Sequence, residues 1–157
     1  MSLQVPILQV LGLSSSLILS GINFGASHLT IPLLYNLPVP TSSRLFSSLY
    51  HRGAITLVPL TLFSGLNFVT LAYLIPPQKL NYAIAGASTL SALAWTQIVM
   101  MSTNKRLCDV SEMGDVEIEK VKVDEVDELL RRWKWMNFVR SGLALAGGLV
   151  GFSTLLR

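Results

Sequence analysis

Polar side chains that could do chemistry lie at the edges of long apolar segments in this sequence of 157 residues. Because polar groups are costly to bury in lipid, such positions are candidates for binding or catalysis. His51 is the acid–base candidate, since an imidazole can change charge near neutral pH and an arginine adjoins it. The candidates fall into these groups: His28; Tyr50, His51 and Arg52; Trp95, Gln97 and residues 103–106; and Arg132, Trp133, Lys134, Trp135, Asn137 and Arg140.

Each group also has a structural interpretation, and both interpretations stay open at this point. Trp133 and Trp135 fit an aromatic belt at a membrane surface, and Asn104 fits a helix C-cap. His28 fits a hydrogen-bonded position near a helix end. Arg140 either faces the interior of a helix bundle or extends its charge to the lipid headgroups. If the groups converge, they form one amphipathic cavity with an apolar body and a cationic mouth.

The sequence offers little for a metal or a classical cofactor. It contains two histidines and one cysteine, and every carboxylate lies between residues 109 and 128. A metal site built from the apolar segments would therefore have too few ligands. No glycine-rich phosphate loop, CxxCH haem motif or GxSxG serine motif is present. We therefore predict no metal and no cofactor.

The distribution of charge predicts an integral membrane protein. Only 13% of residues are charged, against about 25% in soluble domains, and none occurs before Arg44. A helix of about 20 apolar residues can cross a bilayer. We predict an all-α, single-domain bundle of four transmembrane helices over residues 1–157, with an acidic cytoplasmic loop at about 107–128. The spans are expected at about residues 5–34, 53–75, 80–101 and 135–156. The first segment is too long for a signal peptide and lacks a basic start.

Basic residues predict the orientation of these spans. Most of them lie in the two segments that follow the first and the third span, and only Lys79 and Arg157 lie on the opposite side. Both termini should therefore face the lumen and the larger loops the cytoplasm of an endomembrane such as the endoplasmic reticulum. The basic residues form no stripe with exposed aromatics, so no nucleic-acid partner is expected. Two GxxxG pairs, Gly21/Gly25 and Gly147/Gly151, predict close packing between helices and leave a homo-oligomer open.

Three segments resemble the fungal anthrone oxygenase-like family. Residues 49–53 (Leu-Tyr-His-Arg-Gly), followed by Pro59, resemble the start of the second span of that family. Residues 95–107 are similar to its third span and exit, and residues 129–141 are similar to its tryptophan-rich entry to a fourth span. The order and the acidic connection also match, so the resemblance covers nearly the whole chain. Lys105 stands where many members carry a second asparagine, and Ser102 where many carry proline.

The resemblance implies oxidation of an anthrone to an anthraquinone by O2 in polyketide biosynthesis, without an organic cofactor. In that scheme His51 would be the base, with Arg52, Asn104 and Arg140 stabilising the oxyanion. Trp95, Trp133 and Tyr50 would stack on the rings of the substrate. Gln97, Asn137 and His28 complete the expected binding set. Three alternatives remain open: a cyclase or isomerase acting on an apolar natural-product intermediate, a carrier that binds without turnover, and an adaptor that docks a basic partner on its acidic loop.

Overall fold

A computed structural model describes residues 4–156, which form helices and contain no strand. The first helix, α1 (Gln4–Gly25), continues through a π-helical turn (Ala26–Thr30) and a 3₁₀ turn (Ile31–Leu34). A short turn leads to α2 (Val39–Leu74). After the 3₁₀ turn Pro76–Gln78, α3 (Lys79–Trp95), a π-helical turn (Thr96–Met100) and α4 (Met101–Glu112) form one rod. The short α5 (Asp115–Ile118) precedes α6 (Val123–Leu155).

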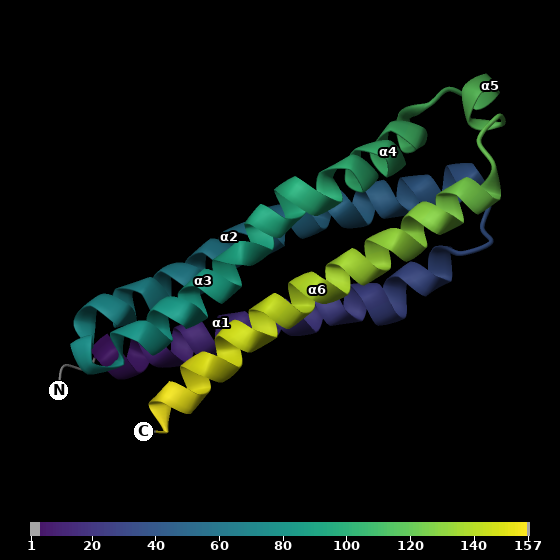
Figure 1. Cartoon of the computed structure of the whole chain (residues 1–157). Helices are drawn as coiled ribbons and strands as arrows, with labels where there is room; N and C mark the ends of the chain where they lie inside the picture. Colours follow the sequence, from purple (N-terminus) through teal and green to yellow (C-terminus); the bar gives the residue numbers. More distant parts are fainter. Residues whose placement is uncertain (1–3, 157) are drawn as a thin grey trace.

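The four rods pack as an antiparallel bundle, in which each rod contacts the next and α6 returns to α1. Both termini lie at the same end as the turn between α2 and α3, and α5 lies at the opposite end (Figure 1). All four rods are long and apolar enough to cross a membrane. This confirms the predicted all-α bundle of four apolar helices.

The rods are longer than the apolar segments that predicted them. α2 begins at Val39 rather than near residue 53, so Tyr50, His51 and Arg52 lie inside a helix. Most of the expected acidic loop is also helical, because α4 runs to Glu112 and α6 starts at Val123. Hydropathy does not detect these extensions, since they are amphipathic. They pack together through buried side chains that include Leu107, Val110, Ile118, Val126 and Leu130.

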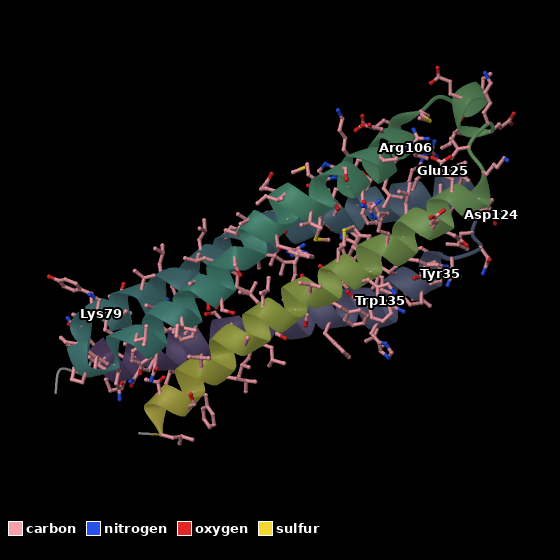
Figure 2. The ribbon with its side chains drawn as sticks, in the orientation of Figure 1. Tyr35, Lys79, Arg106, Asp124, Glu125 and Trp135 are labelled. Carbon is pink, nitrogen blue, oxygen red and sulfur yellow. The ribbon has the colours of Figure 1, made fainter. Side chains whose placement is uncertain are left out.

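α6 is longer than a bilayer core is thick. Its 33 residues span about 50 Å at about 1.5 Å per residue, whereas a bilayer core is about 30 Å thick. The excess lies at the charged end. Figure 2 shows Arg106, Glu125 and Asp124 there, with Lys79 at the opposite end.

Small residues allow the helices to approach closely at the end opposite α5. A Cβ added at Gly147 would overlap Thr89 Oγ1 and lie 2.8 Å from the carbonyl oxygen of Ala85. A Cβ at Gly151 would lie 2.6 Å from the Phe68 ring. The predicted packing role is thus confirmed for this pair. It is wrong for Gly21 and Gly25, where an added Cβ would meet no described atom within 4 Å.

A ladder of polar side chains joins α1 to α6. Ser16 Oγ donates to the carbonyl oxygen of Ala144 at 2.6 Å, and Ser141 Oγ donates to the carbonyl oxygen of Ser20 at 2.9 Å. The α1 residues recur at helical spacing as Ser16, Ser20, Asn23 and Ser27. In lipid, hydrogen bonds of this kind hold helices together where the hydrophobic effect does not.

Asp127 links the turn between α1 and α2 to the start of α6 through hydrogen bonds. Its carboxylate oxygens accept hydrogen bonds from the backbone N–H of Asn36 at 3.2 and 3.3 Å, and Asn36 has a left-handed φ of 58°. One turn later on α6, the Arg131 guanidinium lies 4.6 Å from the centre of the Tyr35 ring. Burial raises the pKa of the Tyr35 phenol, Arg131 opposes this and Asp127 adds to it.

We expect Asp127→Ala to lower the free energy of unfolding by about 1–3 kcal/mol, because the Asn36 N–H would lose its acceptor. Thermal unfolding of the purified protein in detergent measures this. Asp124→Ala is the matched control, since Asp124 is exposed on the same helix, and it should change stability by less than about 0.5 kcal/mol. Equal losses in the two variants would contradict the role given to Asp127.

Candidate functional site: a cavity between the four rods

A cavity of about 180 Å³ lies between the four rods. It is bounded mainly by apolar side chains, with a few polar groups among them. The lining residues are Ile22, Asn23, Ala26, Leu49, Tyr50, Gly53, Ala54, Leu57, Val58, Leu93, Thr96, Gln97, Trp133, Asn137 and Arg140.

A π-helical turn in two of the rods and a proline in a third accompany the cavity. The π-helical turn Ala26–Thr30 begins with the lining residue Ala26, and the turn Thr96–Met100 begins with Thr96 and Gln97. A π turn holds an extra residue and displaces the side chains around it, often at functional sites. In α2, the lining residues precede Pro59, which has no N–H to offer the carbonyl group one turn earlier. Regular packing is therefore interrupted where the cavity lies.

The fourth helix, α6, supplies polar groups from a single face. Trp133, Asn137 and Arg140 are spaced by four and three residues, so they lie above one another along the helix. Trp133 is 5% exposed and Asn137 is 1% exposed. Arg140 is the one charged side chain in the lining. The cavity therefore combines an apolar body with a single guanidinium group.

Trp133 is held in place by Asn104 and Phe46. Its indole Nε1–H donates to Asn104 Oδ1 at 2.8 Å, and both residues are buried. The Trp133 and Phe46 rings meet edge to face at 5.5 Å, and Phe46 stacks on Tyr50 with ring centres 6.3 Å apart. Asn104 is not among the residues that line the cavity. Its observed role is to orient the tryptophan that forms part of the wall.

A double-mutant cycle tests this role. Asn104→Leu should destabilise the protein, because the buried indole N–H of Trp133 would lose its acceptor. Asn104→Leu combined with Trp133→Phe should recover part of that loss, since neither polar group then remains unpaired. We expect a coupling energy of about 1–2 kcal/mol from thermal unfolding in detergent. Strictly additive losses would show that the hydrogen bond does not stabilise the fold.

Asn137 and Arg140 each retain an unused hydrogen-bonding atom. The Asn137 amide donates to the carbonyl oxygen of Asn23 at 2.8 Å and to Ser27 Oγ at 2.9 Å, which fixes the amide orientation. Asn137 Oδ1 and Arg140 Nε are buried without a partner. A buried donor or acceptor left unpaired costs about 1–3 kcal/mol. An acceptor and a donor on neighbouring turns of α6 are thus available to a bound oxygen-containing molecule.

The structure brings together five of the sixteen candidate residues that the sequence singled out: Tyr50, Gln97, Trp133, Asn137 and Arg140. Asn23 and Thr96 also line the cavity. Sequence reasoning missed both residues. The regular spacing of Ser16, Ser20, Asn23 and Ser27 was the signal that could have identified Asn23.

The remaining residues lie outside the lining. His51 and Arg52 are exposed on α2, and His28 is exposed with its ring centre 5.5 Å from that of Phe24. Trp95 Nε1 donates to the carbonyl oxygen of Met136 at 3.1 Å. His51 Nδ1 lies 2.8 Å from the carbonyl oxygen of Ser47. This contact places the proton of a neutral ring on Nδ1 and leaves Nε2 free to act as a base.

No group of three His, Cys, Asp or Glu side chains suited to a metal occurs among residues 4–156. The fold and the cavity thus define a class: a helical bundle of membrane-spanning length that encloses a mainly apolar cavity lined by a single cation. The family described as anthrone oxygenase matches residues 46–150. This chain belongs to that family, which confirms the resemblance found in the three sequence segments.

Individual relatives are similar over most of the chain. An anthrone oxygenase of Claviceps purpurea (strain 20.1) is 28% identical over 92% of this chain and 86% of its own length. The anthrone oxygenase nsrD of Aspergillus novofumigatus is 30% identical over 88% of this chain and 87% of its own length. A noranthrone monooxygenase of Aspergillus flavus is 31% identical over 85% of this chain and 66% of its own length. No solved structure matches.

Proposed function

We propose that this protein is a membrane monooxygenase that oxidises an anthrone-like polyketide to the corresponding anthraquinone with O2 and without a cofactor. The observation that carries the proposal is the cavity, in which one guanidinium group with a buried Nε lies among aromatic and aliphatic walls. Its volume of about 180 Å³ is below the roughly 300–1,000 Å³ of typical drug-sized sites. A compact, flat ring system fits such a space better than an extended polyketide chain.

The reaction needs no external reductant, because the substrate itself supplies the electrons. Removal of a proton from the CH2 group of an anthrone gives a delocalised anion. The anion passes one electron to O2, the two resulting radicals combine through a new C–O bond, and the peroxide anion so formed takes up the released proton to give a hydroperoxide. Loss of water then breaks the O–O bond and the remaining C–H bond. Anthrone and O2 thus give anthraquinone and water, and each product receives one of the two oxygen atoms of O2.

The lining residues have separate roles in this scheme. Arg140 faces the substrate oxygen on which the negative charge collects, and Asn137 Oδ1 accepts a hydrogen bond from a substrate hydroxyl group. Trp133 and Tyr50 flank the rings, while the aliphatic walls exclude water. Preorganised charge in a water-poor cavity stabilises an anion more strongly than the same charge would in water. Asn104 acts by holding Trp133, rather than as a direct oxyanion ligand.

The role of His51 is limited by its position outside the lining. Its ring meets the Tyr50 ring edge to face, with centres 5.5 Å apart, and Tyr50 lines the cavity. We propose that His51 takes the substrate proton at the edge of the cavity, where bulk bases compete with it. Arg52, exposed beside it, contributes a favourable field and no contact with the substrate.

His51→Gln should therefore lower turnover about tenfold near neutral pH, less than for a base that contacts its substrate directly. The loss should shrink as the pH rises, because hydroxide and buffer then replace the imidazole. Initial rates measured from pH 6 to 9 provide the test, with His28→Gln as the control for an exposed histidine. A loss that stays constant with pH would exclude this role.

The proposed reaction is tested directly with purified protein in detergent, an anthrone and ¹⁸O2. We expect quinone formation faster than in the protein-free background, unchanged by a chelator, with one ¹⁸O atom incorporated. Absence of acceleration would overturn the oxygenase proposal for that substrate. Binding of the anthrone without turnover would instead support the carrier alternative.

We also propose an orientation, with both termini in the lumen of an endomembrane and the α5 end in the cytoplasm. It is supported by the basic residues, since apart from Lys79 and Arg157 every basic residue lies toward the α5 side of the cavity or in its lining. Protease protection in sealed microsomes tests it. Cleavage between α4 and α6 from the cytoplasmic side is expected, and protection of that segment would reverse the assignment.

A further inference from the structure

The mouth of the cavity is uncharged, unlike the cationic mouth expected from the sequence. Lining residues that are also exposed on the outer surface mark the mouth: Ile22, Ala54, Val58 and Gln97. None of them carries a charge, and Ile22 and Val58 are each 42% exposed. The one charged lining residue, Arg140, is only partly exposed, and its Nε is buried. The cavity therefore opens among uncharged side chains on the outer surface of the helices.

Three of these residues adjoin one another across the seam between α2 and the α3–α4 rod. These rods run antiparallel, and Gly65 of α2 packs against Leu90 of α3. Val58 on α2 and Gln97 on the other rod each lie seven residues, or about two helical turns, from this contact. Ala54 follows one turn further along α2. The mouth thus lies where Pro59 and the π turn Thr96–Met100 interrupt the two helices.

From Gly65 toward the turn between α2 and α3, the same seam is closed. A Cβ at Gly86 would lie 3.3 Å from the carbonyl oxygen of Gly65, so the two backbones nearly touch there. The surface beside the mouth is strongly apolar, since Ile55 is 77% exposed and Ile98 is 82% exposed. In a bundle that spans a membrane, such residues face lipid chains. The opening is therefore toward the bilayer rather than toward water.

We infer that the seam at Ala54, Val58 and Gln97 is a lateral portal through which a flat, apolar aromatic molecule enters directly from the lipid. This inference rests on the proposed function, because it assumes that the cavity binds such a molecule. The lipid side of the portal also gives direct access to membrane-dissolved O2. The planar product is as apolar as the substrate and returns to the bilayer by the same route.

The experiment uses the full chain in lipid vesicles and 9,10-anthraquinone as the probe. A Trp135→Phe background removes a tryptophan that is 68% exposed, so that quenching reports on Trp133 at the cavity wall and on the partly buried Trp95 packed in the same cluster. Stopped-flow mixing with probe-loaded vesicles gives the association rate, and dilution into empty vesicles gives the dissociation rate. Ala54→Phe narrows the portal, and Ile55→Phe places the same ring on the adjacent lipid-facing position.

Ala54→Phe should slow association and dissociation by a similar factor, about tenfold, and change Kd much less than either rate, because Ala54 lies at the exposed edge of the cavity lining. Val58→Ala should speed both steps, and Ile55→Phe should change neither. If Ala54→Phe behaves like Ile55→Phe, or if Ile22→Phe alone slows exchange, the portal is not at this seam. If Ala54→Phe fails to fold, an unchanged rate in Val58→Ala overturns the inference. If the protein without a substitution at the portal fails to bind the quinone, the proposed function is overturned instead.

Discussion

Arg140→Met is expected to lower turnover by about 10²–10³-fold, the loss seen when a preorganised group that stabilises an anion is removed. Arg140 is the one charged residue in the cavity lining, and its Nε is buried without a partner. Methionine keeps a long side chain there but cannot stabilise an anion. Initial rates of quinone formation in detergent provide the measurement.

The same substitution should leave stability equal or higher. Burying a guanidinium costs free energy that an apolar side chain of similar length does not, so thermal unfolding should occur at the same or a higher temperature. Arg132→Met is the matched control, because Arg132 is exposed on the same helix, and it should keep its activity. An Arg140→Met protein that is both less stable and more than one-tenth as active would show that Arg140 supports the fold and not the reaction.

Gly147→Ala should reduce the free energy of unfolding by about 3 kcal/mol, at the upper end of what overpacking costs. The new methyl group would overlap Thr89 Oγ1, which can rotate, but it would also lie 2.8 Å from the Ala85 carbonyl oxygen, which belongs to the backbone. Helices α3 and α6 must therefore separate. Thermal unfolding in detergent measures the loss.

Gly142→Ala is the matched control on the same helix, since an added Cβ there meets no described atom within 4 Å. It should be neutral or stabilising by up to about 1 kcal/mol, because alanine has the higher helix propensity. Combining Gly147→Ala with Thr89→Ala should recover only part of the loss. Equal stability of the Gly147→Ala and Gly142→Ala proteins would exclude close packing at Gly147.

The membrane bundle could be predicted from sequence because its signal is local. Charge is absent from the first 43 residues and sparse in the later apolar segments, so hydropathy alone locates the rods. Their ends could not be found in this way. α2 begins at Val39 and α6 at Val123, where amphipathic turns pack against other helices rather than against lipid.

The composition of the site was harder to predict, because it depends on the rotation of each helix. Tyr50 and His51 were chosen together, but consecutive helical residues point about 100° apart, and only Tyr50 reaches the cavity. Trp133, Asn137 and Arg140 could be grouped, because their spacing places them on one face of any helix. No pattern in the sequence indicated the π turns, and these turns determine how the Thr96 and Gln97 side chains are oriented.

The contrast between α6 and the other three rods, two with a π turn and one with an internal proline, has a consequence for substrate range. The cation and its neighbouring amide lie on α6, whose α-helix runs unbroken from Val123 to Leu155, so their spacing along the helix is fixed. The opposite walls come from two π turns and from the turns preceding Pro59, where a single insertion or deletion can restore or shift the helix locally. Changes confined to those turns should alter which ring systems are accepted while the oxidation chemistry persists. Efforts to redirect this protein to new polyketides should therefore keep α6 intact and vary residues 26–30, 53–58 and 96–100.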